Sequence, residues 1–258
     1  MWAKSNEGQQ IYGLIGYPLG HSFSKDYFNK KFSLLQLNAI YENFELSSAH
    51  SFPELIQRFP NLCGLNVTLP YKEAIIPYLD ALSPEAKAIQ AVNVIRFTSQ
   101  GLIGYNSDYY GFMTSFRPLL RPFDRCAIVL GTGGAARAVA YALSLLDISV
   151  QFVSRTKRMG TITYEELIER KLLATTSLVI NCTPLGMFPH TAKKPPLPYQ
   201  EISSFHLLYD LIYNPAETLF LSSGKEQGAM TKNGLEMLHL QAEKAWDIWQ
   251  EPFDTSSF

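Results

Sequence analysis

The amino-acid sequence predicts an α/β protein with two domains, and three features of the chain support this fold class. Short apolar runs alternate with amphipathic stretches of helical periodicity over most of the 258 residues. Two arginine-proline pairs, at residues 117–118 and 121–122, interrupt that alternation. Beyond them, a glycine-rich loop joins a strand pattern to a helix pattern, which is typical of a β-α-β unit in a parallel sheet. We therefore expect domains over residues 1–117 and 118–234, followed by a terminal segment, residues 235–258.

The first half of the chain alternates predicted strands with predicted helices. Short apolar runs at residues 11–15, 39–44 and 62–67 predict strands. Between them, apolar residues recur on one helical face, which predicts two helices, the first starting near Ser24. The positions that mark these two faces are Tyr27, Phe28, Phe32 and Leu35, and then Phe52, Leu55, Ile56 and Phe59.

A helix start and a hairpin complete the first half. Ser83, Pro84 and Glu85 provide a capping hydroxyl, a proline in the first turn and an acid, which is typical of a helix N-terminus. Two strand patterns, at residues 93–97 and 102–105, flank a short polar turn and are expected to pair as a hairpin.

The second half begins with the β-α-β pattern. Strand patterns at residues 127–130 and 150–153 enclose a helix pattern at residues 134–146. Further elements are expected as buried strands at residues 178–180 and 207–211 and as an amphipathic helix at residues 235–249. The expected apolar stripe of this last helix consists of Leu235, Leu238, Ala242, Ala245, Trp246 and Trp249.

The charge balance and the cysteines argue against several classes of protein. Lysine plus arginine number 22 and aspartate plus glutamate number 23, so bulk charge offers no attraction to nucleic acid or to a membrane surface. The three cysteines and five histidines show no metal-ligand spacing, so we expect free buried thiols and no metal. The N-terminus is too polar for a signal peptide, and no apolar run is long enough to span a membrane. A cytoplasmic protein is therefore expected.

The glycine loop fits the pattern G-x-G-x-x-G/A between a strand and a helix. Glycine allows the tight turn and lets the backbone approach a pyrophosphate, which the first amides of the helix can then bind. A tight strand-to-helix turn without a ligand is the simpler alternative. We expect a Rossmann-type domain that binds a dinucleotide, with the cofactor in contact with Gly131, Gly133, Gly134 and Ala135.

The end of the next strand favours NADP over NAD. An NAD-binding unit carries an acid about 20 residues after the glycines, where it binds the ribose 2′-hydroxyl. This chain instead has Ser154, Arg155 and Thr156 at that place. A guanidinium suits a 2′-phosphate because two of its N–H groups can meet two oxygens. The alternative interpretation is a solvated basic turn.

Polar side chains occur in three loops of the first domain. Hydride transfer to a ketone requires a proton donor and groups that orient the substrate. The candidates are Ser22 and Ser24, then Thr68 and Lys72, and then Asn93 and Asp108. Simpler roles exist for each type, since a serine or aspartate at a helix start is often a cap and a lysine is often a solvated charge. The residues alone leave these alternatives open.

Nine segments together resemble the shikimate dehydrogenase family. They occur in the family order over roughly residues 11–249 and read GYPLGHSFS, GLNVTLPYKEAI, AVNVI, YNSDYYGF, VLGTGGAARAV, SRT, NCTPLGM, YDLIYNP and NGLEMLHLQAEKAW.

The resemblance implies the NADP-dependent reduction of 3-dehydroshikimate to shikimate in aromatic amino-acid biosynthesis. In proteins similar to this chain, serines that match Ser22 and Ser24 bind the substrate carboxylate. The pair that matches Lys72 and Asp108 carries the acid–base role. The sequence leaves open which of the two moves the proton. Other implied contacts are Thr68, Asn93, Tyr213 and Gln241 with the substrate, and Leu211 and Gly234 with the nicotinamide.

The resemblance also implies a substrate domain, a Rossmann-like NADP domain and a C-terminal helix that packs back on the first domain. The sequence leaves open whether the protein is a monomer or a homodimer. One departure follows Arg155, where the family usually has a helix, because residues 157–162 here lead almost directly to Tyr164. Cys182 stands where alanine is usual, which we interpret as packing.

Two alternatives are weighed against this function. A quinate or quinate/shikimate dehydrogenase that uses NAD often carries an acid after the second strand of the cofactor domain, and some replace one of the paired serines by threonine. This chain has Arg155 and both serines. A non-catalytic protein that binds NADP or a metabolite would be expected to lose Lys72 or Asp108 first, and both are present.

Overall fold

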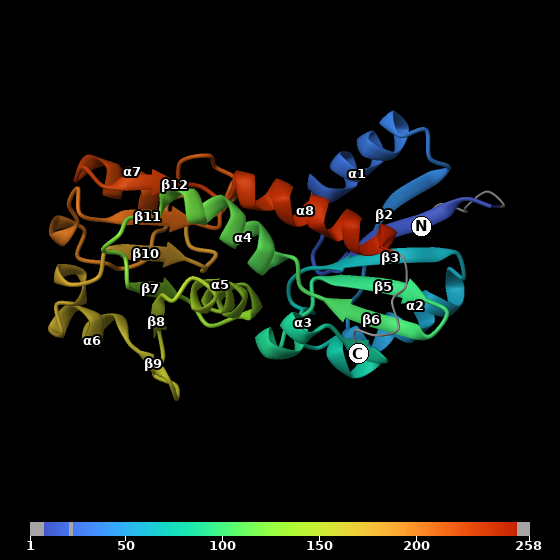
Figure 1. Ribbon diagram of the computed structural model, residues 1–258, viewed down its shortest axis with the longest axis horizontal. Coiled ribbons are helices and arrows are strands. Elements are labelled where there is room, and N and C mark those ends of the chain that lie inside the picture. The colour runs from blue at the N-terminus through green and yellow to red at the C-terminus, as the bar shows by residue number, and fades with distance from the viewer. Residues whose placement is uncertain (1–7, 21–22, 252–258) are drawn as a thin grey trace. The chain divides into compact units, whose positions relative to one another are not determined.

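The computed structural model describes residues 8–20 and 23–251, and the chain divides into two compact units, each with one six-stranded sheet (Figure 1). The first unit comprises residues 1–107 together with residues 242–258, and the second comprises residues 108–241. Helix α8 (Leu235–Gln250) starts in the second unit and ends in the first. The expected return of the C-terminal helix to the first domain is therefore confirmed.

The first sheet is mixed. Its strands are β1 (Gln10–Gly16), β2 (Ala39–Glu45), β3 (Leu62–Val67), β4 (Ala81–Leu82), β5 (Val94–Thr98) and β6 (Gly101–Tyr105), in the order β2-β1-β3-β5-β6-β4. β1 is parallel to β2 and to β3, whereas β5 is antiparallel to β3 and β6. The expected hairpin is thus confirmed. Because β1 and β3 are parallel, the loops after them leave the sheet at the same edge.

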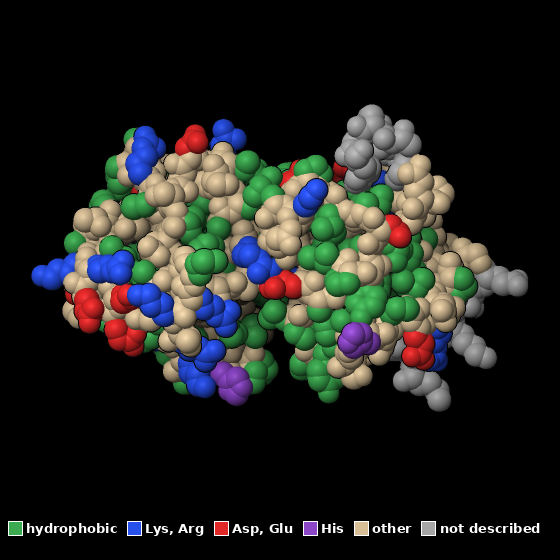
Figure 2. Space-filling model, turned by 90° about the horizontal axis from the view of Figure 1, so that it is seen from below, with side chains coloured by type: hydrophobic (Ala, Val, Ile, Leu, Met, Phe, Trp, Pro, Cys, Tyr) green, Lys and Arg blue, Asp and Glu red, His purple; other side chains and the backbone are tan. Residues whose placement is uncertain are grey.

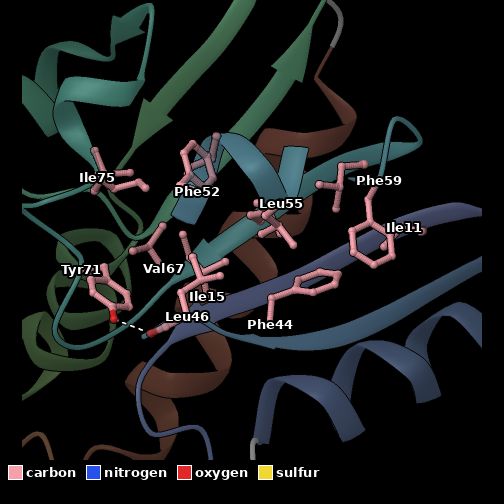
Figure 3. Close-up of a cluster of buried hydrophobic side chains, with 14 of the residues drawn as sticks. Ile11, Ile15, Phe44, Leu46, Phe52, Leu55, Phe59, Val67, Tyr71 and Ile75 are labelled. Atoms are coloured by element: carbon pink, nitrogen blue, oxygen red, sulfur yellow. Dashed lines mark hydrogen bonds between the residues drawn. The ribbon is translucent and has the colours of Figure 1, made fainter. Parts of the chain in front are cut away.

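Alternation along β1 gives this sheet two apolar faces. Ile11 and Ile15 point to one face, where they pack with side chains of β2, β3 and helix α2 (Phe52–Arg58) (Figure 3). Tyr12 and Leu14 point to the other face, which helices α1 (Phe23–Leu34) and α8 cover. Both sides of the sheet are therefore protected from solvent.

Trp249 of α8 lies directly on β3. A Cβ atom at Gly64 would lie 2.4 Å from the indole nitrogen of Trp249, so only glycine permits this approach. The same nitrogen donates a hydrogen bond of 3.1 Å to the Ile95 carbonyl on β5. The last turns of α8 are thus held on the first sheet by packing and by a polar contact.

The helices of the first unit confirm one sequence prediction and contradict part of another. Helix α3 (Pro84–Ile89) starts where expected, and the Ser83 hydroxyl accepts a hydrogen bond from the Ala86 amide. In α1, Phe28 and Phe32 are buried, but the chain leaves the helix before Leu35, which is 51% exposed. Including Leu35 in the apolar face was therefore wrong. Leu235 at the start of α8 is also exposed, so its place in the predicted stripe was wrong too.

The second sheet is entirely parallel. Its strands are β7 (Cys126–Leu130), β8 (Ser149–Val153), β9 (Thr161–Ile162), β10 (Leu178–Asn181), β11 (Leu207–Asp210) and β12 (Met230–Lys232). Their order is β12-β11-β10-β7-β8-β9. Counted from β7, this is the doubly wound order 3-2-1-4-5-6 of the Rossmann fold, and the strand order reverses between β7 and β10. The predicted Rossmann-type domain is confirmed.

Helices cover both faces of the second sheet. Their bounds are α4 (Asp108–Phe116), α5 (Gly134–Ser144), α6 (Tyr164–Glu169) and α7 (Leu219–Glu226). α4 and α5 pack in one apolar cluster, and α6 and α7 pack in the other. The sequence places a boundary after α4, at residue 118, but Phe112 and Phe116 of this helix are buried against Tyr209, so α4 belongs to the second unit.

The remaining short elements are 3-10 turns at Ala49–Ser51, Ile76–Tyr78, Arg117–Leu119, Leu172–Ala174 and Tyr199–Glu201. None of the helices in residues 8–20 and 23–251 has the length and apolar character needed to cross a lipid bilayer.

Candidate functional site

The glycine loop between β7 and α5 leaves room for a ligand. Gly131 has a φ of +103°, which favours glycine, and its amide donates to the Val153 carbonyl at 2.9 Å. Gly133 is the N-cap of α5, no side chain caps it, and a Cβ atom added there would meet no atom within 4 Å. The first amides of an 11-residue helix therefore face open space, which fits a pyrophosphate.

The turn after β8 presents a guanidinium. The Ser154 hydroxyl bonds to the carbonyl of Thr156 and accepts from the Thr156 amide at 3.3 Å, so it closes the turn around Arg155. Arg155 is exposed, and within the described part of the chain it forms no ion pair with a carboxylate. Lys157, by contrast, pairs with Glu166. Arg155 is thus available to an anion.

The connection from β8 to β9 contains no helix. The expected shortening after Arg155 is therefore seen in the structure.

Helix α6 follows β9 and begins with a capping box, in which Thr163 and Glu166 each accept from the other's backbone amide. On the face shown in Figure 2, lysine and arginine side chains are frequent over the second unit, on the left.

The ends of β10 and β11 carry a buried polar network that the sequence analysis missed. Asp210 accepts hydrogen bonds from Asn181 Nδ2 at 3.0 Å and from Thr218 Oγ1 at 2.6 Å. Burial raises the pKa of Asp210 to about 7, although its hydrogen bonds act to lower it. The sequence held one signal for this network: each of two apolar strands ends in a polar residue, Asn181 in NCTPLGM and Asp210 in YDLIYNP.

Leu211 and Gly234 are brought together, as the resemblance implies. A Cβ atom at Gly234 would lie 2.1 Å from the Leu211 carbonyl oxygen, and the Gly234 amide donates to Ile212 at 3.1 Å. Tyr213, two residues after Leu211, is partly exposed, and burial raises the pKa of its hydroxyl. Cys182 is a free thiol whose pKa burial raises well above its usual value, which agrees with its interpretation as packing.

The loop after β3 holds Thr68 and Lys72 at the edge of the first sheet. The Thr68 amide donates to Ile15 at the end of β1, at 2.9 Å. The carbonyl of Lys72 accepts from the Val92 amide at 2.7 Å, which places Lys72 beside the start of β5. Asn93 follows Val92 directly. It therefore lies at the same end of this sheet as Lys72.

Asn93 links this edge to the segment before Asp108. Its Oδ1 accepts from the Ser107 amide at 2.6 Å, and its Nδ2 donates to the Ser107 hydroxyl at 3.0 Å. Asn93 is 3% exposed, so its amide is fixed by these partners. Asp108 follows Ser107 directly and is the first residue of α4 in the second unit.

A line of buried polar side chains connects Asn93 to α1. Asn66 Nδ2 donates to the Asn93 carbonyl at 3.3 Å, and the Tyr41 hydroxyl donates to Asn66 Oδ1 at 2.7 Å. Burial raises the pKa of Tyr41 well above its usual value, and a hydrogen bond with the Ser24 side chain opposes that shift. Ser24, Asn66 and Asn93 are thus linked through Tyr41. Tyr41 and Asn66 were not predicted, because nothing in a strand pattern shows which polar side chains will meet.

Two predicted site residues remain, Ser22 and Gln241. Ser22 lies outside the described residues. Gln241 lies on α8 at the end of the second unit, where its Nε2 donates to the Leu238 carbonyl at 2.9 Å. In the described ranges, no group of three or more histidine, cysteine, aspartate or glutamate side chains could hold a metal ion.

The chain is similar to known proteins over most of its length. Residues 14–95 match the family described as the shikimate dehydrogenase substrate binding domain. The shikimate dehydrogenase (NADP(+)) of Carboxydothermus hydrogenoformans is 39% identical over 95% of this chain and 92% of its own length.

Solved structures are similar over nearly the whole chain. Shikimate 5-dehydrogenase of Thermus thermophilus, in complex with NADP(H) and shikimate, has a TM-score of 0.81 and 30% identity over 94% of each chain. The enzyme of Listeria monocytogenes, in complex with shikimate and NAD, has a TM-score of 0.83 and 27% identity over 99% of this chain and 96% of its own.

Proposed function

The chain belongs to the shikimate dehydrogenase family, and we propose that it catalyses the NADPH-dependent reduction of 3-dehydroshikimate to shikimate in aromatic amino-acid biosynthesis. One observation carries the proposal: a unit that matches the family's substrate-binding domain is joined to a Rossmann sheet with an open glycine loop and an exposed Arg155. A small-molecule substrate explains the first unit, and a phosphorylated dinucleotide explains the glycine loop and Arg155 of the second.

The second unit would hold NADP by its glycine loop and by the turn after β8. Gly131, Gly133, Gly134 and Ala135 would contact the pyrophosphate at the start of α5, where a Cβ atom at Gly133 meets no atom within 4 Å. Ser154, Arg155 and Thr156 would bind the 2′-phosphate, and Leu211 and Gly234 would border the nicotinamide. Bound there, the cofactor supplies the hydride that the ketone carbon accepts.

Residues of both units would bind the substrate and supply the proton. We assign the carboxylate to Ser22 and Ser24, and the ring oxygens to a set that consists of Thr68, Asn93, Tyr213 and Gln241. We assign the acid–base role to Lys72 and Asp108. An ammonium can donate a proton or a hydrogen bond to the oxygen that becomes negative, and a carboxylate can keep an ammonium charged and oriented. Such an interaction is strongest in the transition state, so it accelerates the reaction rather than tightening binding alone.

A spectrophotometric assay tests the proposed function. The purified chain is mixed with NADPH and 3-dehydroshikimate, and the loss of absorbance at 340 nm is followed. We expect rapid oxidation of NADPH, and reduction of NADP+ when shikimate is supplied. If the folded chain binds NADPH without turnover of either substrate, the proposed function is wrong and a binding role replaces it.

A quinate/shikimate dehydrogenase that uses NAD is the second candidate. Two observations favour it: the similar Listeria monocytogenes structure holds NAD, and this chain lacks a helix between β8 and β9. The exposed Arg155 favours NADP, because a neutral ribose hydroxyl gives a guanidinium less to bind. Rates with shikimate and quinate, each with NADP+ and NAD+, separate the candidates. A cytoplasmic location and a monomer or homodimer stay predictions of the sequence.

A further inference from the structure

Asp210 is a buried carboxylate that the proposed chemistry does not use. It lies at the C-terminal end of β11 and is 0% exposed. Its oxygens accept from Asn181 Nδ2 at 3.0 Å, from the Ile212 amide at 3.1 Å and from Thr218 Oγ1 at 2.6 Å. Among the residues that the structure describes, no lysine, arginine or histidine forms an ion pair with it. Three neutral donors therefore hold this carboxylate.

Each donor belongs to a loop at the same edge of the second sheet. Asn181 is the last residue of β10, and its Oδ1 accepts from the Thr183 amide at 3.0 Å and from the Thr183 hydroxyl at 2.6 Å in the loop that follows. Thr218 ends the loop after β11 and caps α7 by accepting from the Leu221 amide at 3.4 Å. One carboxylate thus ties two loops together.

Leu211 lies within this arrangement. Its amide donates to the Asn181 carbonyl at 3.0 Å, and its own carbonyl meets Gly234 too closely for any side chain at that position. We propose that Asp210 is a positioning residue that holds the loops after β10 and β11 in place around Leu211, where the nicotinamide end of NADP would bind. This inference rests on the proposed function, because that function assigns Leu211 and Gly234 to the nicotinamide.

The donors around Asp210 match its ionised form. A protonated carboxyl would place an O–H group against atoms that are themselves donors, so one of the three hydrogen bonds would have to break or reverse. Burial raises the pKa of Asp210 to about 7. The titratable groups that face it are the Cys182 thiol and the Tyr199 hydroxyl, whose pKa values burial and the Asp210 charge both raise. Protonation relieves the buried charge but replaces one of these hydrogen bonds, so we expect the contacts between Asp210 and the two loops to rearrange as pH falls below neutrality.

Asp124 provides a matched control in the same unit. It is 2% exposed and accepts from the Arg121 amide at 2.8 Å, from the Arg121 guanidinium at 3.0 Å and from the Ser177 hydroxyl. It precedes β7, and Ser177 precedes β10, so it ties connections at the opposite edge of the sheet. Asp124 and Asp210 are thus two buried, hydrogen-bonded carboxylates of the same unit, but Asp124 also pairs with the Arg121 guanidinium, and only Asp210 lies at the edge with the glycine loop.

The experiment compares Asp210→Asn with Asp124→Asn. The dissociation constant of NADPH is measured by its fluorescence from pH 5.5 to 8.5, KM values are measured for NADP+ and shikimate, and urea unfolding shows that each variant folds. At pH 8 we expect Asp210→Asn to weaken NADPH binding about fivefold or more and to flatten the pH dependence of the dissociation constant. Asp124→Asn should lower stability and leave NADPH binding as in the wild type.

Thr218 provides a second pair of variants if Asp210→Asn does not fold. Thr218→Val removes one donor to Asp210, and Thr218→Ser keeps it. We expect weaker NADPH binding in the valine variant and near-normal binding in the serine variant. Equal NADPH dissociation constants within both pairs would overturn the positioning role. A wild-type chain that binds NADPH but does not oxidise shikimate would instead overturn the proposed function, and the binding comparison would still decide on Asp210.

Discussion

The two sheets end in buried polar networks of different chemistry. In the first unit, Tyr41, Asn66, Asn93 and Ser107 form a line of hydroxyl and amide groups. In the second unit, the network of Asn181 and Thr218 has the carboxylate of Asp210 at its centre. Asn93 of the first network is itself a candidate site residue, and Asp210 of the second directly precedes Leu211, which is another.

This difference predicts different responses to pH. Burial raises the pKa of Tyr41 well above its usual value, so the line in the first unit stays uncharged over the physiological range. Burial raises the pKa of Asp210 to about 7, so the second network changes its charge in that range. A network that stays neutral can orient a substrate in the same way over this pH range. A network that ionises makes the proposed cofactor site of the second unit sensitive to pH.

The largest expected effect is on the first unit. Lys72→Met should lower kcat at least about a hundredfold, because it removes the group that meets the developing negative charge. The dissociation constant of NADPH should not change, since the glycine loop is intact. Steady-state assays and NADPH fluorescence measure these two quantities. Lys87→Met, at an exposed position of α3, is the control. A Lys72→Met kcat within threefold of the wild type would remove Lys72 from the mechanism.

The second unit should show the opposite kinetic pattern. Arg155→Ala should raise KM for NADP+ about tenfold and leave KM for NAD+ and for shikimate nearly unchanged, because only NADP+ carries the 2′-phosphate. Initial rates with both cofactors test this. Arg170→Ala, which removes an exposed partner of Glu166, is the matched control. Equal losses with NADP+ and NAD+ would show that Arg155 does not read the 2′-phosphate.

A smaller effect tests the neutral polar network of the first unit, which includes Tyr41 and Asn66. Tyr41→Phe removes one hydroxyl and leaves Asn66 Oδ1 without its donor, so KM for shikimate should rise about fivefold at nearly constant KM for NADP+. Tyr12, which pairs with Tyr41 in the sheet register and is also buried, gives the control variant Tyr12→Phe. If both variants lose stability in urea but neither changes KM for shikimate, the line is structural only.

The smallest effect is the pH dependence of stability. The unfolded chain releases the Asp210 proton near its ordinary pKa of 3.8, whereas the folded chain retains it up to about pH 7. The stabilisation from this proton is therefore complete below pH 3.8 and is lost as pH rises towards 7. Between pH 5 and pH 8, urea unfolding should show the wild type losing on the order of 1 kcal/mol more than Asp210→Asn. Parallel curves for the two proteins would contradict the raised pKa.

Much of the fold was predictable because local pattern and final environment agree. β3 was predicted at its observed bounds, since Leu62–Val67 is a short apolar run followed by a polar loop. The start of α3 was predictable because Ser83 caps its own helix through an amide three residues away. Strand β12 and helix α7 were missed. β12 has three residues and is polar at two of them, and α7 contains serine and glycine, which are weak helix formers.

The sequence by itself determined the glycine loop, the basic turn at Arg155 and most of the longer strands and helices, because these depend on residues close together in the chain. Only the tertiary structure decided which buried polar groups meet. Tyr41 reaches Asn66, and Asp210 joins Asn181 to Thr218, because strand pairing brings residues that are distant in the chain close together. A buried polar group without a hydrogen-bond partner raises the free energy of the folded state. These groups are therefore paired in the fold, although no local sequence pattern predicts their partners.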